Sequence, residues 1–236
     1  MDNTNKENKV ILYSADDFGK NKIANTNILK LVKNKKIDRV SVMINGEFSL
    51  TEIESLLNSN IKLDIHLDIQ NKITNKWKLR DEIFTRGIIF IKDSITGKIS
   101  PRKIKTLWEK QINDFKSIFC KYPDGLNSHQ HIHFFPPYFK IAQELSQKYK
   151  IRYIRFGYKS FCSFNSIALI LNILKTMDRV YIKKKSIIST DFMISADWIK
   201  NFDFKKHKNT LLKQKNIEIV FHPERKEEFN YLENIK

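Results

Sequence analysis

Apolar positions along the chain follow two periods that alternate from one end to the other. Short runs rich in β-branched residues predict strands, and apolar residues three or four positions apart predict helices. The predicted strands are Val10–Tyr13, Arg39–Ile44, Ile61–Leu67, a histidine-rich stretch within Leu126–Pro136, Ile151–Phe156, Ser186–Met193 and Ile217–Phe221. The predicted helices are Asn21–Lys35, Leu50–Leu57, one that begins at Ser100 and Pro101, Pro136–Tyr149, Ser163–Met177 and Ala196–Lys215.

Strands and helices that alternate in this way predict a mostly parallel sheet. The 236 residues contain no internal repeat and no clear linker, and this length is common for one α/β barrel. We therefore expect a single α/β domain over residues 1–236, with a flexible polar start at residues 1–8. The irregular stretch 70–100, which contains Trp77, is a long connection of the kind that often grips a substrate.

Three of the six histidines, His129, His131 and His133, stand two residues apart. On a strand they would line one face, because successive side chains point to opposite faces. A neutral imidazole is the commonest protein ligand for a divalent metal and transfers protons well near neutral pH. The alternative is a polar strand whose histidines are merely hydrogen-bonded.

Further polar residues stand at the ends of other predicted strands. Asp16 and Asp17 follow the first strand, His66 ends the third and His222 follows the last. Chemistry in α/β folds gathers at these carboxyl ends, and one carboxylate with two imidazoles makes a three-ligand metal site. Asp64 or Asp68 could hold His66 in place. For the Asp pair, an Asp-rich turn or a helix cap is the alternative.

The motifs Ala15-Asp16-Asp17-Phe18-Gly19, Ser128-His129-Gln130-His131-Ile132-His133 and His222-Pro223, with His66 after a strand, resemble the YdjC-like carbohydrate deacetylases. That family includes the chitooligosaccharide deacetylases. The resemblance covers nearly the whole chain in the right order. It implies a (β/α) barrel-like fold and metal-dependent removal of an N-acetyl group from an acetylated saccharide.

The resemblance also implies residue roles. Asp17, His66 and His129 would bind the metal, Asp16 would be the general base and His222 the general acid. His131 and Arg155 are candidates for substrate binding. The sequence departs from the family's usual glycine at Asp64 and at Glu224. Zn²⁺ suits two histidines and a carboxylate, whereas an exposed, oxygen-rich site also suits Mg²⁺.

Charge adds one alternative to this interpretation. The net charge of +17 would suit a nucleic-acid partner, but the lysines are spread along the chain and match no nucleic-acid module. We expect weak, nonspecific polyanion binding and no specific nucleic acid. A different metal hydrolase on the same scaffold and a noncatalytic polyanion binder are both compatible with the sequence.

Location and partners follow from smaller signals. Cys120 and Cys162 form no C-x-x-C motif, which favours a reduced, cytoplasmic interior. The polar N-terminus lacks the apolar core of a signal peptide, and no apolar run approaches the ~20 residues that a membrane span needs. We expect an acetylated sugar as the partner, and a homodimer is compatible with the sequence. The aromatic residues Trp77, Phe134, Phe135 and Trp198 could stack on a sugar, although core packing is the favoured use for most of them.

Overall fold

A parallel sheet forms the centre of the protein. The computed structural model describes residues 10–69, 100–159, 166–182, 188–199 and 215–235. The strands in this part of the chain are β1 (Val10–Phe18), β2 (Arg39–Val42), β3 (Lys62–Leu67), β4 (Gly125–Ser128), β5 (Tyr153–Ile154), β6 (Phe192–Ser195) and β7 (Asn216–Phe221). They form a 7-stranded sheet in the order β5-β4-β3-β2-β1-β7-β6, and every described pairing is parallel.

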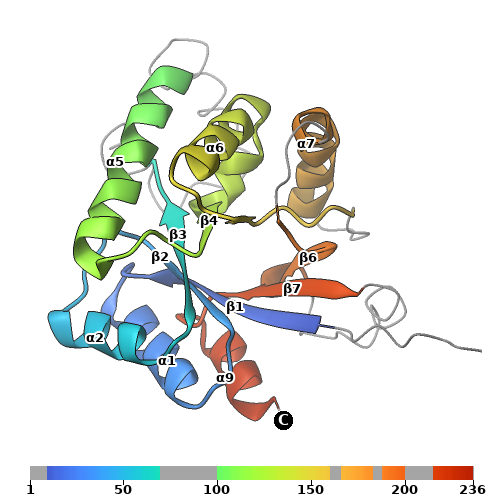
Figure 1. Ribbon diagram of the computed structural model, residues 1–236. Coiled ribbons are helices and arrows are strands. Elements are labelled where there is room, and N and C mark those ends of the chain that lie inside the picture. Colours follow the sequence, from blue (N-terminus) through green and yellow to red (C-terminus); the bar gives the residue numbers. More distant parts are fainter. Residues whose placement is uncertain (1–9, 70–99, 160–165, 183–187, 200–214, 236) are drawn as a thin grey trace, which may run out of the picture.

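Helices connect successive strands, as the alternating pattern predicts. The α-helices among the described residues are α1 (Lys22–Lys33), α2 (Leu50–Asn58), α5 (Pro101–Phe119), α6 (Pro136–Lys148), α7 (Ser166–Ile182) and α9 (Lys226–Asn234). Two 3₁₀ helices, η1 (His129–Phe134) and η2 (Ala196–Trp198), directly follow β4 and β6. Helices α9, α1 and α2 gather on one side of the strands, and α5, α6 and α7 on the other (Figure 1).

The sheet curls until its two edge strands meet. Tyr153 in β5 forms a parallel bridge with Ile188, just before β6. Ile154 N–H donates to the carbonyl of Ile188 at 3.0 Å, and Tyr158 N–H donates to that of Thr190 at 3.1 Å. These bonds join the edges, so the expectation of a single (β/α) barrel-like α/β domain is confirmed for the described residues.

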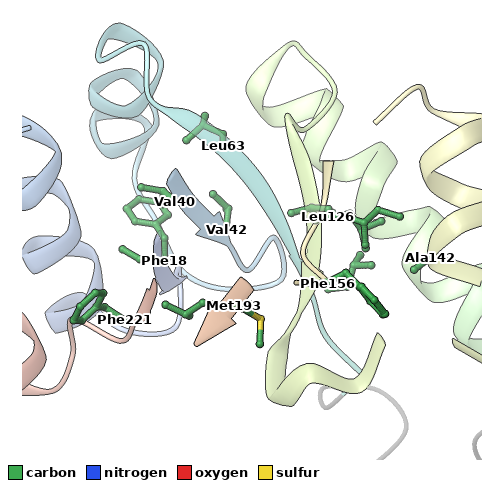
Figure 2. Packing of buried hydrophobic residues seen from close by; sticks show 14 of the residues in the cluster. Phe18, Val40, Val42, Leu63, Leu126, Ala142, Phe156, Met193 and Phe221 are labelled. Atoms are coloured by element: carbon green, nitrogen blue, oxygen red, sulfur yellow. The ribbon is translucent and has the colours of Figure 1, made fainter. Parts of the chain in front are cut away.

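Apolar side chains between the sheet and the helices form one buried cluster. Figure 2 shows Phe18, Val40 and Val42 around β1 and β2, and Leu126 and Ala142 around β4 and α6. Helix α5 contributes a stripe at helical spacing, whose buried members are Ile104, Trp108, Ile112, Phe115 and Phe119. Burying such side chains stabilises a fold by roughly 1.5–3 kcal/mol each.

Helix starts follow the capping signals in the sequence. The Ser100 hydroxyl accepts a hydrogen bond from Lys103 N–H, and Pro101 occupies the first turn of α5, as predicted. Ser49 and Glu52 form a capping box at the start of α2, which begins at Leu50 as predicted. The described helices include none that is long and apolar enough to cross a bilayer.

The prediction of a histidine strand is wrong. Strand β4 ends at Ser128, and His129–Phe134 form the tight turns of η1. Gln130 and His131 have φ angles of 54° and 56°, in the left-handed region, so the chain reverses where the strand would have continued. The three imidazoles therefore do not line one face of a strand, and each has different partners.

Smaller differences concern lengths and termini. Strand β5 is shorter than expected, and helix α9 after the last strand was not predicted. Of the expected helix Ala196–Lys215, the structure describes η2, Ile199 and Lys215, which is not helical. Residues 1–8, the connection with Trp77, Cys162 and His207 lie outside the described residues. Phe134 is fully buried and Trp198 nearly so, in line with the favoured core role.

Candidate active site

Two buried carboxylates end the first strand. Asp16 and Asp17 are 2% and 1% exposed, although neighbouring side chains on a regular strand point in opposite directions. The register between β1 and β2 shifts between Ala15 and Phe18, and Asp17 has a left-handed φ of 72°. A bulge of this kind re-aims a side chain. It allows both acids to approach the same imidazole, that of His66.

Asp17 meets two histidines from other strands. His66 Nε2 lies 3.3 Å from Asp17 Oδ1, and His129 Nδ1 lies 3.0 Å from the same oxygen. Within the described residues these three form the one group of candidate ligands, with one ligand atom from each residue within 4.8 Å of the others. Four ligands at roughly 2.0–2.1 Å from a tetrahedral cation lie about 3.3 Å apart, so this donor set fits a Zn²⁺-sized ion.

Asn127 holds the other nitrogen of His66. Its Oδ1 makes a short hydrogen bond with His66 Nδ1, and both side chains are buried. The expectation that Asp64 holds this imidazole is wrong, because the Asp64 carboxylate binds the guanidinium of Arg39. For Asp68, the main chain hydrogen-bonds the Gln111 side chain. Sequence reasoning missed Asn127 because it considered only carboxylates within two residues of the histidine.

Asp16 is bound by Arg155. The guanidinium donates to both carboxylate oxygens, at 2.6 and 2.9 Å, and to Glu218 Oε1 at 2.8 Å. Burial alone would raise the pKa of Asp16, but the adjacent Arg155 charge holds it well below its usual range. Arg155 is fully buried, so the geometry favours a role in positioning Asp16 over direct substrate contact. Sequence reasoning missed Glu218. The signal that could have identified it is the presence of an acidic residue inside the otherwise apolar strand β7.

His222 follows β7 and is backed by an acid from α9. Its Nδ1 lies 3.5 Å from Glu228 Oε2, and its backbone N–H donates to the same oxygen at 2.6 Å. Burial lowers the pKa of His222, but Glu228 with Asp17 and Asp16 outweighs it and raises this pKa to about 9. Arg225 anchors Glu228 at 2.8 Å. Sequence reasoning did not predict helix α9, and it therefore did not identify Glu228 as a partner of His222.

The remaining two histidines of the motif do not join the three candidate ligands. His133 is fully buried between the Ser128 hydroxyl at 2.7 Å and the Arg155 carbonyl oxygen at 2.9 Å, so it holds η1 against the residue that follows β5. His131 lies edge-on to Trp198 at 5.6 Å between ring centroids. Burial lowers the pKa of each imidazole to about 3. The role of His131 in substrate binding stays a prediction.

Lys20 binds the candidate ligand Asp17 on the side opposite the histidines. Lys20 Nζ lies 3.0 Å from Asp17 Oδ2, the oxygen that faces away from the histidines, and also binds Glu224. Asn21 donates to the other Glu224 oxygen at 3.0 Å. The unusual Glu224 therefore links the loop after β7 to the loop after β1. The unusual Asp64 is likewise neutralised by Arg39.

Comparison with known proteins agrees with the motifs. The model of the YdjC-like protein family matches residues 10–234. A curated mouse protein (Mus musculus) described as a carbohydrate deacetylase is 21% identical over 153 residues, which is 61% of this chain and 49% of that protein. The chain thus spans about half the length of this relative.

The solved structure of a putative cellobiose-phosphate cleavage protein from Enterococcus faecalis V583 has the same fold. The TM-score is 0.63 at 17% identity, over 91% of this chain and 81% of that one. The family match covers all the described strands and the residues brought together at their ends. The chain belongs to the YdjC-like protein family.

Proposed function

We propose that this protein is a metal-dependent hydrolase that removes the N-acetyl group from an acetylated saccharide, such as an oligosaccharide containing N-acetylglucosamine. The observation that carries the proposal is the convergence of Asp17, His66 and His129 within 4.8 Å of one another. The similarity to a carbohydrate deacetylase and the family match support the same reaction class.

The donor set defines what the metal would do. Asp17, His66 and His129 would hold a divalent cation, Zn²⁺ or Mg²⁺, and leave positions open for water and substrate. When bound, such a cation supplies a Lewis acid for water and for the amide carbonyl oxygen. Lys20 binds the second oxygen of Asp17, which leaves Oδ1 directed at the histidines.

Asp16 and His222 supply the proton transfers. The Arg155 charge keeps Asp16 ionised, and the ionised form is the one that can accept a proton from water. The water oxygen bonds to the acetyl carbon and the carbon–nitrogen bond breaks. His222, which is protonated at neutral pH, donates its proton to the leaving nitrogen. The products are acetic acid, which ionises to acetate in solution, and the free amino sugar. Asp16 then loses its proton to solvent and His222 regains one, so atoms and charge balance.

The test is acetate release from short N-acetylated chitin oligomers by purified protein whose metal content is measured by elemental analysis. Chelator should abolish release, and His129→Ala should lose both metal and activity. Gln130→Asn is the matched control, because Gln130 is the exposed neighbour and Asn tolerates its left-handed φ.

Acetate release that persists in metal-free protein would contradict the proposal. A panel of acetylated sugars, other amides and phosphoesters extends the test. Turnover of non-acetyl substrates alone would assign the same site to a different metal hydrolase.

A further inference from the structure

Asn127 and His66 lie opposite each other on neighbouring strands. They are register partners in the β3–β4 pair, so their side chains lie on the same side of the sheet. Asn127 is fully buried, and its Oδ1 hydrogen-bonds to His66 Nδ1. A buried amide with so specific a partner controls the orientation of the imidazole ring.

The other end of the Asn127 amide is also held. Its Nδ2 donates to the hydroxyl oxygen of Ser41, in β2, at 2.9 Å. The same hydroxyl oxygen accepts from Arg155 Nη2 at 3.2 Å. Ser41 is fully buried. With the amide nitrogen directed at Ser41, the amide oxygen is directed at His66.

This orientation selects one tautomer of His66. An amide oxygen only accepts hydrogen bonds, so the Nδ1 that faces it must carry the proton. Nε2 then keeps its lone pair and faces Asp17 Oδ1 at 3.3 Å. A ring nitrogen binds a cation through this lone pair, and the bond made by the other nitrogen determines which one has it.

We infer that Asn127 is a positioning residue that presents His66 Nε2 to the metal, and that Ser41 ties it to Arg155. One chain of hydrogen bonds then runs from Asp16 through Arg155, Ser41 and Asn127 to His66. The proposed base and the proposed metal ligand are held by a single buried network. The inference rests on the metal site of the proposed function.

The experiment measures zinc affinity by competition with a chromogenic chelator, together with the absorption spectrum of the Co²⁺ form. Asn127→Ala should weaken zinc binding roughly 10- to 100-fold, the usual effect of losing a residue that orients a ligand. Asn127→Asp should bind zinc about as tightly as the unchanged protein does, because a carboxylate of the same size also accepts a hydrogen bond from His66 Nδ1. Asn113→Ala, at an exposed position on α5, should bind zinc as the unchanged protein does.

The outcomes separate this inference from its premise. If the unchanged protein binds zinc no better than His129→Ala does, the metal site itself fails. If the unchanged protein binds zinc and Asn127→Ala binds it within twofold as well, the role of Asn127 is overturned. If Asn127→Ala does not fold, zinc binding by Asn127→Asp that is weaker than that of the unchanged protein also overturns it.

A second variant tests the link to Arg155. Ser41→Ala removes the acceptor that orients Asn127. As a single substitution it should therefore weaken zinc binding. In an Asn127→Asp background it should have little effect, because both oxygens of a carboxylate accept and no orientation needs to be selected. If the Ser41→Ala single variant binds zinc as tightly as the wild-type protein does, the link is overturned.

Discussion

His222 and Glu228 show how a single contact raises the pKa of the proposed proton donor. The carboxylate of Glu228 is 1% exposed and lies 3.5 Å from Nδ1, on the side of the ring away from Nε2. A buried negative charge next to an imidazole favours its protonated form. The pair therefore keeps His222 protonated at neutral pH, as its proposed role as the general acid requires.

Glu228→Gln should move the alkaline limb of the pH profile of kcat/KM to lower pH. The folded pKa of His222 is raised to about 9, so the acid form is present below that value and is lost as the pH rises through it. Without the Glu228 charge the loss should begin nearer the ordinary value for histidine. The measurement is acetate release as a function of pH, from mildly acidic to alkaline buffers.

Glu227→Gln is the matched control, since Glu227 is the exposed neighbour on the same helix. An alkaline limb that stays near the wild-type position in Glu228→Gln would contradict the assignment of His222 as the general acid.

At the scale of the elements, strands β1, β5 and β7 share one buried set of charges. Arg155, after β5, binds Asp16 from β1 and Glu218 from β7, and Glu218 also binds Ser14 and Tyr153. All of these side chains are buried. Buried charges are tolerated only when they are paired. These contacts therefore favour the arrangement of the strands in which Arg155 reaches both acids.

Arg155→Met should lower the free energy of unfolding by about 3–5 kcal/mol, because Asp16 and Glu218 would stay buried without their partner. Urea denaturation measures the change. Arg152→Met is the control on the same segment, where the side chain is exposed, and should change the stability by less than about 0.5 kcal/mol. A loss in Arg155→Met no larger than in the control would show that the network adds little to stability.

At the scale of the whole molecule, the closure between β5 and β6 decides whether the sheet is open or barrel-like. Gly157 lies at this junction with a φ of 64°, and a Cβ there would come within 2.7 Å of the Met193 backbone nitrogen and Cβ. Close packing of the two edges and a left-handed backbone both favour glycine here.

Gly157→Ala should therefore destabilise the closure. We expect the free energy of unfolding to fall by about 1–3 kcal/mol, because of backbone strain at residue 157 and the displacement of β6 at Met193. Chemical unfolding gives the loss, and hydrogen exchange of the amides of Ile154 and Tyr158 locates it. Exchange that is unchanged at these two amides would mean that the edges do not part.

The charge of the whole chain leads to a separate expectation. With a net charge of +17, the protein should bind heparin or DNA weakly at low salt and release it as salt rises from about 50 to 200 mM. Asp17→Ala should leave this binding unchanged, since nonspecific binding uses the dispersed lysines. Tight binding at physiological salt would favour a polyanion-binding function instead.

The sequence by itself determined the class of fold and indicated where the candidate site lies. Strand and helix periods are local properties, so they predicted that the sheet is parallel and where several of its strands and helices lie. The carboxyl ends of parallel strands meet at one edge, so the acids and histidines at the strand ends could be grouped before their distances were known. Motif resemblance then implied which of them would bind the metal and which would transfer protons.

Tertiary structure alone decided how these residues are held. The bulge that turns Asp16 and Asp17 toward one imidazole and the left-handed turns that end the histidine strand depend on packing. The supporting contacts join positions that are distant in sequence: His66 and Asn127 are 61 residues apart, and Arg155 and Asp16 are 139 apart. No local period encodes such pairs, because they exist only when the closed sheet brings the strands side by side.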